Sequence, residues 1–244
     1  ASARITLPLT TKTDEASEYL VNVELRIKED CAWAEAGYNI ADEQFALTAR
    51  PAWTAHTSNG GSLTISGNSV SGTDSEGNDF RMAFDNSGKM TAWTYAGKQI
   101  LHTNANGTIA SGAAPDFNSC RNIDNDKGST ANVGCVNSSS TKIIKALTKD
   151  DASGCATMTV QGNAKNCQYT IRYTFYPDAT VDMETTFSPS GPTRRLGLGL
   201  QLASGFENVE FYARGPRSNY SDRKTGSYLG RFTTTVDDMV EEQI

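Results

Sequence analysis

The chain has 244 residues, with a hydrophobic fraction of 37 % and a charged fraction of 20 %. This length accommodates one large β domain, or a medium domain with part of a second, and the composition predicts a packed core and excludes a disordered chain. The net charge of −6 repels phosphate backbones, so no nucleic-acid partner is expected. No membrane partner is expected either, since no run approaches the roughly 20 apolar residues that span a bilayer.

The two ends of the chain lack the signals of a complete polypeptide. Ala1 to Pro8 has no initiator Met and none of the basic and apolar stretches of a signal peptide, and Glu241 to Ile244 has no turn or cap. We therefore expect both ends to be cut from a longer protein.

Alternating apolar and polar residues run through almost the whole chain and predict antiparallel strands. These runs are rich in Thr, Val, Tyr and Phe and are separated by Gly, Asn, Asp and Ser, which favours an all-β fold of the sandwich type. Asp42–Thr48 is expected to form a turn or a short helix. In chain order, the predicted strands are 19–27, 62–66, 80–84, 90–95, 155–160, 168–176, 180–187, 195–202 and 208–214.

A linker-like stretch, residues 51–61, precedes a fresh set of strands, and we place a domain boundary near Thr57. Residues 1–57 hold too few strands for an independent sandwich, and residues 58–244 would form the second domain. Within the latter, residues 107–139 make a long polar loop with little strand character. Loops beyond about 15 residues are usually functional or disordered.

The five cysteines contain no C-x-x-C pair, which argues against a zinc site. Cys120 and Cys135 bracket a polar loop, and Cys155 and Cys167 bracket a predicted hairpin, so two disulfides are candidates; five reduced thiols are the alternative. Disulfides would indicate a periplasmic or extracellular protein, and reduced thiols a cytoplasmic one. Cys31 is expected to be a small buried residue.

Motifs that carry catalysis are missing from the sequence. Neither a G-x-S-x-G nucleophile elbow nor a phosphate-binding loop is present, and we expect His56 and His102 to be solvated or packed. A glycosidase needs two carboxylates about 5–9.5 Å apart, but the 28 acidic residues do not single out a pair. No catalytic residue, metal ligand or cofactor is therefore assigned.

Two polar constellations remain. Asp124, Asn125, Asp126 and Gly128 lie in one turn of the long loop, where such groups bind sugar hydroxyls, cap their own turn or ligate a hard cation. Residues 214–223 combine a Gly-Pro turn at a strand end with charges that form either a structural knot or a binding edge. The residues of this second constellation are Arg214, Gly215, Pro216, Asn219, Tyr220, Asp222 and Arg223.

At these residues the chain resembles the C-terminal region of family 2 β-galactosidases. Residues 196–202 (LGLGLQL), 209–216 (VEFYARGP), 219–223 (NYSDR) and 236–239 (VDDM) resemble the family's C-terminal β domain, which carries a G-x-G-P-x-E-N-Y-x-D-R signature. Residues 32–38 (AWAEAGY) look like the A-W-x-x-A-G-[HY] segment that closes the preceding domain. Residues 84–88 (FDNSG) resemble the family's F-[ND]-x-x-[ST]-G hairpin with one turn residue fewer, and residues 124–128 (DNDKG) match its D-N-D-x-G loop.

The resemblance implies both a fold and a role. Residues 1–57 would be the last strands of an immunoglobulin-like sandwich, and residues 58–244 the first part of a truncated antiparallel supersandwich of the galactose mutarotase-like type. Because the family's catalytic glutamates lie in a TIM barrel N-terminal to this region, the chain would be a non-catalytic fragment. Its implied partners are that barrel and a galactoside or related carbohydrate, which the D-N-D-x-G loop would approach.

Three departures from the family and two alternatives accompany this interpretation. Ser218 replaces the signature's Glu, Ala213 replaces its first Gly, and residues 121–123 (RNI) stand where the family has R-A-P. The first alternative is a free-standing carbohydrate-binding module with an exposed aromatic platform such as Trp93 or Tyr220. The second is a mutarotase-like epimerase, for which the two histidines are poorly placed.

Overall fold

The computed structural model describes residues 4, 6, 14, 16–119, 139–165, 167–191, 195–217, 219 and 224–239. The chain divides into two compact units, one of residues 1–56 with 212–232 and one of residues 57–211 with 233–244. Within the described ranges there are strands and short 3-10 turns but no α-helix, and every strand pair with a described register is antiparallel. The predicted all-β, antiparallel fold class is confirmed.

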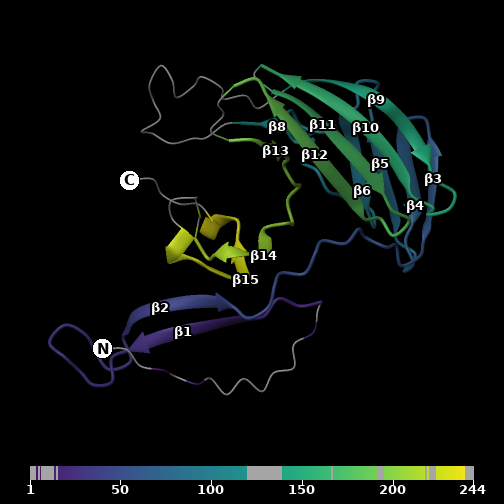
Figure 1. Ribbon diagram of the computed structural model, residues 1–244. Coiled ribbons are helices and arrows are strands. Elements are labelled where there is room, and N and C mark those ends of the chain that lie inside the picture. Colours follow the sequence, from purple (N-terminus) through teal and green to yellow (C-terminus); the bar gives the residue numbers. More distant parts are fainter. Residues whose placement is uncertain are drawn as a thin grey trace. The chain divides into compact units, whose positions relative to one another are not determined.

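Two antiparallel sheets lie face to face in the larger unit (Figure 1). The first has the order β3-β4-β5-β6-β7 and consists of β3 (Ser62–Ser66), β4 (Ser69–Thr73), β5 (Asp79–Phe84), β6 (Met90–Tyr95) and β7 (Lys98–Gln99). The second has the order β12-β11-β10-β9 and consists of β9 (Ser140–Lys149), β10 (Ala156–Ala164), β11 (Cys167–Phe175) and β12 (Val181–Pro189). A short pair, β8 (Asp116–Asn118) with β13 (Gly197–Gly199), completes the unit.

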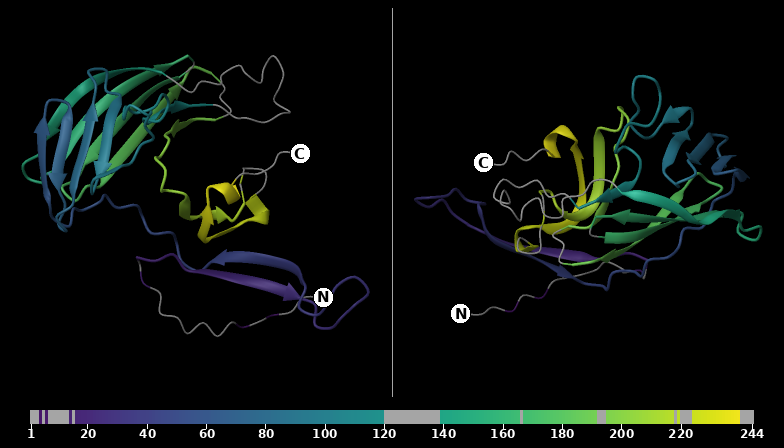
Figure 2. Two further views of the ribbon diagram at one scale, coloured as in Figure 1. Left: turned by 180° about the vertical axis from the view of Figure 1, so that it is seen from behind. Right: turned by 90° about the horizontal axis from the view of Figure 1, so that it is seen from above.

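The core lies between these two sheets, which Figure 2 shows from behind. Every second residue of β11 is buried because its side chain points into the sandwich, from Cys167 to Phe175. The ring of Phe84, in the opposite sheet, lies 5.2 Å from that of Tyr173 and 5.9 Å from that of Phe175. Full burial of each such side chain contributes about 1.5–3 kcal/mol, so this layer supplies the main stabilisation of the unit.

The smaller unit is built on a hairpin of β1 (Leu20–Arg26) and β2 (Asn39–Ala46). The side chain of Gln44 exchanges two hydrogen bonds of 2.9 Å with the backbone N–H and carbonyl of Leu229. The hydroxyl of Tyr212 donates to Glu18 Oε2 at 2.8 Å. Residues 212–232 are therefore fastened to the N-terminal hairpin. They include most of the two-stranded sheet of β14 (Asn208–Gly215) and β15 (Tyr228–Thr235). The domain limits inferred from the sequence stay a prediction.

Two strands lie where the sequence suggested otherwise. The expected turn or short helix at Asp42–Thr48 is wrong, because residues up to Ala46 belong to β2 and pair with β1, as in Asp42 opposite Glu24. The 107–139 stretch was expected to show little strand character, but it contains β8, whose central residue Phe117 is fully buried. In both places tertiary pairing satisfies the backbone and outweighs local propensity.

The predicted Cys155–Cys167 disulfide is wrong, since both thiols are free. The two residues do bracket a hairpin strand, but Ala156 pairs with Phe175 and Ala164 pairs with Cys167, so the cysteines lie at opposite ends of β10. Nine residues at about 3.3 Å each separate them by roughly 30 Å, far beyond the span of a disulfide. Cys31 is exposed, contrary to expectation. The Cys120–Cys135 pair lies outside the described residues.

The turn between β4 and β5 is held by the carboxylate of Asp74. Its Oδ1 accepts hydrogen bonds from the backbone N–H groups of Asn78 and Glu76, each at 2.9 Å, and its Oδ2 accepts one from the hydroxyl of Tyr95 at 2.8 Å. These donors, with the backbone N–H of Asn78 first, lower the pKa of Asp74 from 3.8 to about 2. The ionised carboxylate is therefore preferred in the folded state.

This shift predicts a specific acid response. A lowered pKa in the folded state gives a stabilisation that is complete above the usual pKa of 3.8 and is lost as the pH falls toward about 2. Asp74→Asn should therefore reduce the free energy of unfolding at neutral pH, and the difference from the wild type should shrink as the pH falls from about 4 to 2. Urea titrations of both proteins across this range measure the difference; one that stays constant down to pH 2 would contradict the assignment.

Candidate functional site

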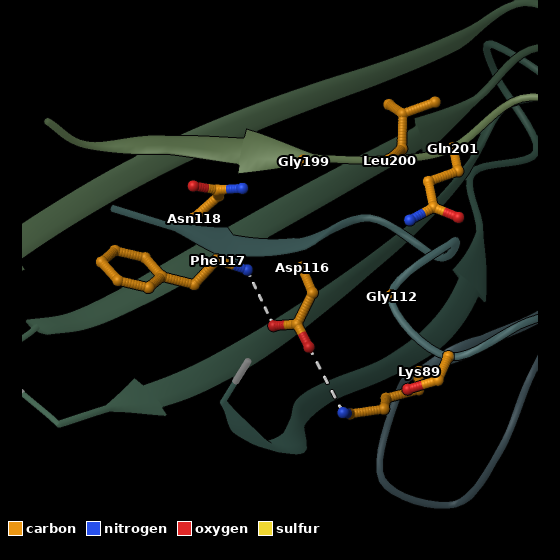
Figure 3. A pocket seen from close by; sticks show the side chains of 9 residues that line it. Lys89, Gly112, Asp116, Phe117, Asn118, Gly199, Leu200 and Gln201 are labelled. Atoms are coloured by element: carbon orange, nitrogen blue, oxygen red, sulfur yellow. Dashed lines mark hydrogen bonds and ion pairs between the residues drawn. The ribbon is translucent and has the colours of Figure 1, made fainter. Parts of the chain in front are cut away.

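A cavity of about 400 Å³ opens beside the short β8–β13 pair of the larger unit (Figure 3). Its volume lies in the range of small-molecule sites, about 300–1,000 Å³. Its lining combines polar side chains with two glycines and two apolar residues. The lining residues are Lys89, Ser111, Gly112, Asp116, Phe117, Asn118, Gly199, Leu200 and Gln201.

The walls of the cavity are fixed by backbone pairing. β8 and β13 are paired in register, with Gly199 opposite Asp116 and Leu198 opposite Phe117. A Cβ on Gly199 would lie 3.3 Å from Asn118 Nδ2, so the two strands approach each other closely at this position. On the far side, the backbone N–H of Gln201 donates to the carbonyl of Ala113 at 3.1 Å. Backbone hydrogen bonds therefore hold both walls of the cavity in place.

Asp116 is the centre of the polar network at this site. Its Oδ1 accepts hydrogen bonds from Ser139 Oγ at 2.7 Å, from the Tyr169 hydroxyl at 2.8 Å and from the backbone N–H of Phe117 at 2.7 Å. Its Oδ2 accepts one from Lys89 Nζ at 3.3 Å. The side chain of Asp116 is only 14 % exposed. A carboxylate offers about four acceptor positions, so these four donors occupy nearly all of its capacity.

Tyr169 donates its hydroxyl to Asp116 from the buried core of the larger unit. Its ring stacks on that of Phe117, with centroids 5.5 Å apart, and contacts the ring of Phe187 at 6.1 Å. Burial raises the pKa of Tyr169 above its usual value of 10, and the nearby charge of Asp116 raises it further. The hydroxyl therefore keeps its proton at neutral pH and is available to donate to Asp116.

The hairpin turn before β6 places Lys89. Asp85 Oδ1 accepts hydrogen bonds from the backbone N–H of Ser87 at 2.8 Å, from its hydroxyl at 2.6 Å, and from the backbone N–H of Lys89 at 3.0 Å. Gly88 adopts φ +86°, and a Cβ there would lie 2.7 Å from Val160 Cγ2. The sequence-predicted turn at residues 85–88 is therefore confirmed, and it directs the Lys89 side chain toward Asp116.

The described lining of this cavity offers hydrogen-bonding groups and one carboxylate. Both classes of glycosidase need a pair of carboxyl groups flanking the scissile bond. Among the described lining residues, Asp116 is the single carboxylate, and Lys89 forms an ion pair with it. The amides of Asn118 and Gln201 and the hydroxyl of Ser111 are groups that bind sugar hydroxyls or water.

The first group of site residues predicted from the sequence is the D-N-D-x-G loop. Asp124, Asn125, Asp126 and Gly128 lie outside the described residues. The chain enters their segment at Ser119, which is buried, and returns at Ser139, a ligand of the Asp116 carboxylate. Asp116, Phe117 and Asn118, which line the cavity, thus precede this segment in the chain by a few residues.

The second constellation is described only in part. Arg214 is the last residue but one of β14 and donates to the carbonyls of Ser227 at 2.8 Å and Lys224 at 3.2 Å. Gly215 is buried and Asn219 is half-buried. Tyr220, Asp222 and Arg223 lie outside the described residues, so the role of the predicted knot stays a prediction; the described contacts of Arg214 are with backbone carbonyls.

Sequence reasoning missed Asp116, Ser139 and Tyr169 as partners. Alternation along β11 was enough to place Tyr169 on an inward face, but nothing local links it to Asp116, 53 positions earlier. Asp116 stood in a stretch that was read as loop. The aromatic residue Phe117 next to an acidic residue was the one available signal of the strand β8.

Comparison with known proteins places this chain in a family. The profile of the β-galactosidase small chain matches residues 76–244. The chain belongs to the β-galactosidase family. The profile of β-galactosidase domain 4 matches residues 1–48, so the resemblance recognised in the sequence is confirmed.

Curated β-galactosidases extend the match over nearly the whole chain. The β-galactosidase of Priestia megaterium is 29 % identical over 248 residues, covering 97 % of this chain and 23 % of the relative. That of Halalkalibacterium halodurans is 25 % identical over 244 residues, covering 95 % and 23 %. That of Staphylococcus xylosus is 38 % identical over 91 residues, covering 37 % and 8 %. The chain thus spans less than a quarter of the length of these relatives.

The free thiols bear on the compartment predicted for the protein. The free thiols of Cys155 and Cys167 remove one of the two bridges on which a periplasmic or extracellular location was predicted. Of the helices described, none is long and apolar enough to span a membrane. The compartment stays a prediction.

Tyr169 depends on a glycine across the sheet, which gives a stability prediction. Gly162 pairs with Tyr169, and a Cβ at this position would lie 2.1 Å from the ring carbon Cζ. Gly162→Ala should displace the ring and lower the free energy of unfolding by about 1–3 kcal/mol. Gly191→Ala is the matched control, since nothing lies within 4 Å of its Cβ position; it should change stability by less than about 0.5 kcal/mol. Equal effects in urea denaturation would refute this role for Gly162.

Proposed function

We propose that this chain is a non-catalytic β region of a β-galactosidase-type glycoside hydrolase. It contributes scaffold to the parent enzyme, and one loop, which contains Asp124 to Gly128, to the enzyme's sugar site. The observation that carries the proposal is the state of Asp116, the single carboxylate among the described residues of the cavity. Its oxygens are engaged by Lys89, Ser139 and Tyr169, so it does not serve as nucleophile or general acid.

The fold supports the same conclusion. A TIM barrel alternates strands with helices over about 250 residues, whereas the described residues form antiparallel sheets. In the resemblance to family 2 β-galactosidases, the catalytic glutamates belong to a barrel N-terminal to this region. The chemistry of the parent would therefore be carried by residues outside this chain, and this chain would assist it.

The N-terminal hairpin supports a longer parent. Leu25 and Phe45 are 55 % and 52 % exposed, and they share one face of the β1–β2 hairpin with Val21 and Val23. The opposite face carries Gln44, which binds residues 212–232. An apolar sheet face of this kind normally packs on a second sheet, as expected if β1 and β2 are the last strands of an immunoglobulin-like sandwich.

No observation favours the free-standing carbohydrate-binding module. Such modules need an exposed aromatic platform, and Trp93 is half-buried and packs against the core of the larger unit. Tyr220 lies outside the described residues. The fragment interpretation therefore has support that the module interpretation lacks.

Two assays test the proposal. The purified chain should hydrolyse o-nitrophenyl β-galactoside no faster than buffer, because the described lining of its cavity offers a single carboxylate, whereas the polypeptide encoded by the surrounding reading frame should hydrolyse it. Deleting the segment that corresponds to residues 1–244 should abolish that activity. Turnover by the isolated chain that survives a second purification would overturn the non-catalytic role, and full activity of the deleted enzyme would overturn the contribution to the site.

A further inference from the structure

The two ends of the segment 117–138 meet at one carboxylate. Asp116 precedes this segment, and Ser139 follows it immediately. Ser139 Oγ lies 2.7 Å from Asp116 Oδ1 and 2.5 Å from the Tyr169 hydroxyl, which itself lies 2.8 Å from the same Oδ1. Three oxygens from three separate stretches of chain therefore form a compact triangle beneath the cavity.

We infer that Asp116 is a positioning residue, whose carboxylate clamps both ends of this segment to the rigid core through Tyr169. The inference rests on the proposed function, in which the segment between these ends contributes to the sugar site. Asp116 itself does not touch substrate in this account, because nearly all of its acceptor capacity is taken by groups of the protein. Its effect on catalysis would be exerted through the placement of the chain that it holds.

The clamp is anchored in the buried core of the larger unit. Tyr169 is 1 % exposed, its ring stacks on Phe117, and its position over Gly162 leaves no space for a shift toward β10. Phe117 adjoins Asp116 and donates its backbone N–H to the same Oδ1. The carboxylate is thus fixed from the side of the core, and Ser139 is fixed by the carboxylate.

Lys89 completes the clamp from the opposite sheet. Its ammonium lies 3.3 Å from Asp116 Oδ2, and its backbone is held by the Asp85 turn. In addition, Thr141, near the start of β9, contacts the hydroxyl of Ser87 in that turn at 3.4 Å. Charged hydrogen bonds with restricted geometry are stronger than neutral ones, and a loop with fixed ends samples far fewer conformations than one with free ends.

The chain offers a matched control for this clamp. Tyr176 donates its hydroxyl to Asp182 Oδ2 at 2.8 Å, so it makes the same chemical contact as Tyr169 with Asp116. This contact joins Tyr176, which follows β11, to β12, and its two residues are not among those of the clamp. Tyr176→Phe therefore removes an equivalent hydrogen bond and leaves the clamp intact.

Limited trypsin digestion of the full chain tests the clamp directly. Tyr169→Phe, Ser139→Ala and Asp116→Ala should each increase the rate of cleavage after Arg121 and Lys127, relative to cleavage after Lys165, by about tenfold, since local opening becomes easier. Asp116→Asn keeps one acceptor oxygen and should give an intermediate increase. Tyr176→Phe should give none. If Asp116→Ala does not fold, Tyr169→Phe and Ser139→Ala decide.

Equal relative rates in Tyr169→Phe and Tyr176→Phe would overturn the clamp. Kinetics of the longer polypeptide then test the consequence for function: Tyr169→Phe should raise KM for o-nitrophenyl β-galactoside or lower kcat, with Tyr176→Phe unchanged. A polypeptide without galactosidase activity would reject the proposed function, whereas unchanged kinetics in an active one would reject only the positioning role. The digestion result stands independently of both.

Discussion

The inward-facing column of β11 is the interaction on which the larger unit depends. Tyr169, Ile171, Tyr173 and Phe175 are all at most 2 % exposed and fill the space between the two sheets. The same column serves the candidate site, because Tyr169 ends it with a hydroxyl that reaches Asp116. Tyr169 therefore belongs both to the hydrophobic core and to the polar network around Asp116. Displacing this ring would disturb the hydrophobic layer and free the carboxylate at once.

Much of this architecture follows from local pattern. The runs at 62–66 and 90–95 became β3 and β6 with the predicted bounds, because strict alternation with β-branched and aromatic residues has few other solutions. β2 was missed, since Asp42, Glu43 and Gln44 are poor strand formers, and only their pairing with β1 makes them extended. The Cys155–Cys167 bridge failed for a related reason: closeness along the sequence does not show which end of a hairpin a residue occupies.

The candidate site was less accessible from sequence than the fold. The family resemblance pointed to Asp124–Gly128, whereas the described network is made by residues at the base of that segment. Asp116, Ser139 and Tyr169 have no motif that joins them, and they meet only because Phe117 of β8 packs on Tyr169 of β11. Long-range polar contacts of this kind depend on topology, which periodicity does not encode.

Membership of the β-galactosidase family gives this scaffold its context. The chain covers less than a quarter of its curated relatives, and within the described cavity a single carboxylate accepts hydrogen bonds on both of its oxygens. The account therefore assigns the chain a supporting part in hydrolysis. In the proposed function, the polar groups around Asp116 hold neighbouring stretches of the chain in place, and residues outside this chain cleave the glycosidic bond.

A covalent trap of the catalytic nucleophile tests this central claim most directly. Retaining glycosidases form a glycosyl-enzyme intermediate through one carboxylate, and a 2-deoxy-2-fluoro-galactosyl inactivator accumulates that intermediate. Peptide mass spectrometry of the inactivated longer polypeptide should find the label on a carboxylate outside the segment of residues 1–244. A label on Asp116 or on any other carboxylate within this segment would contradict the account.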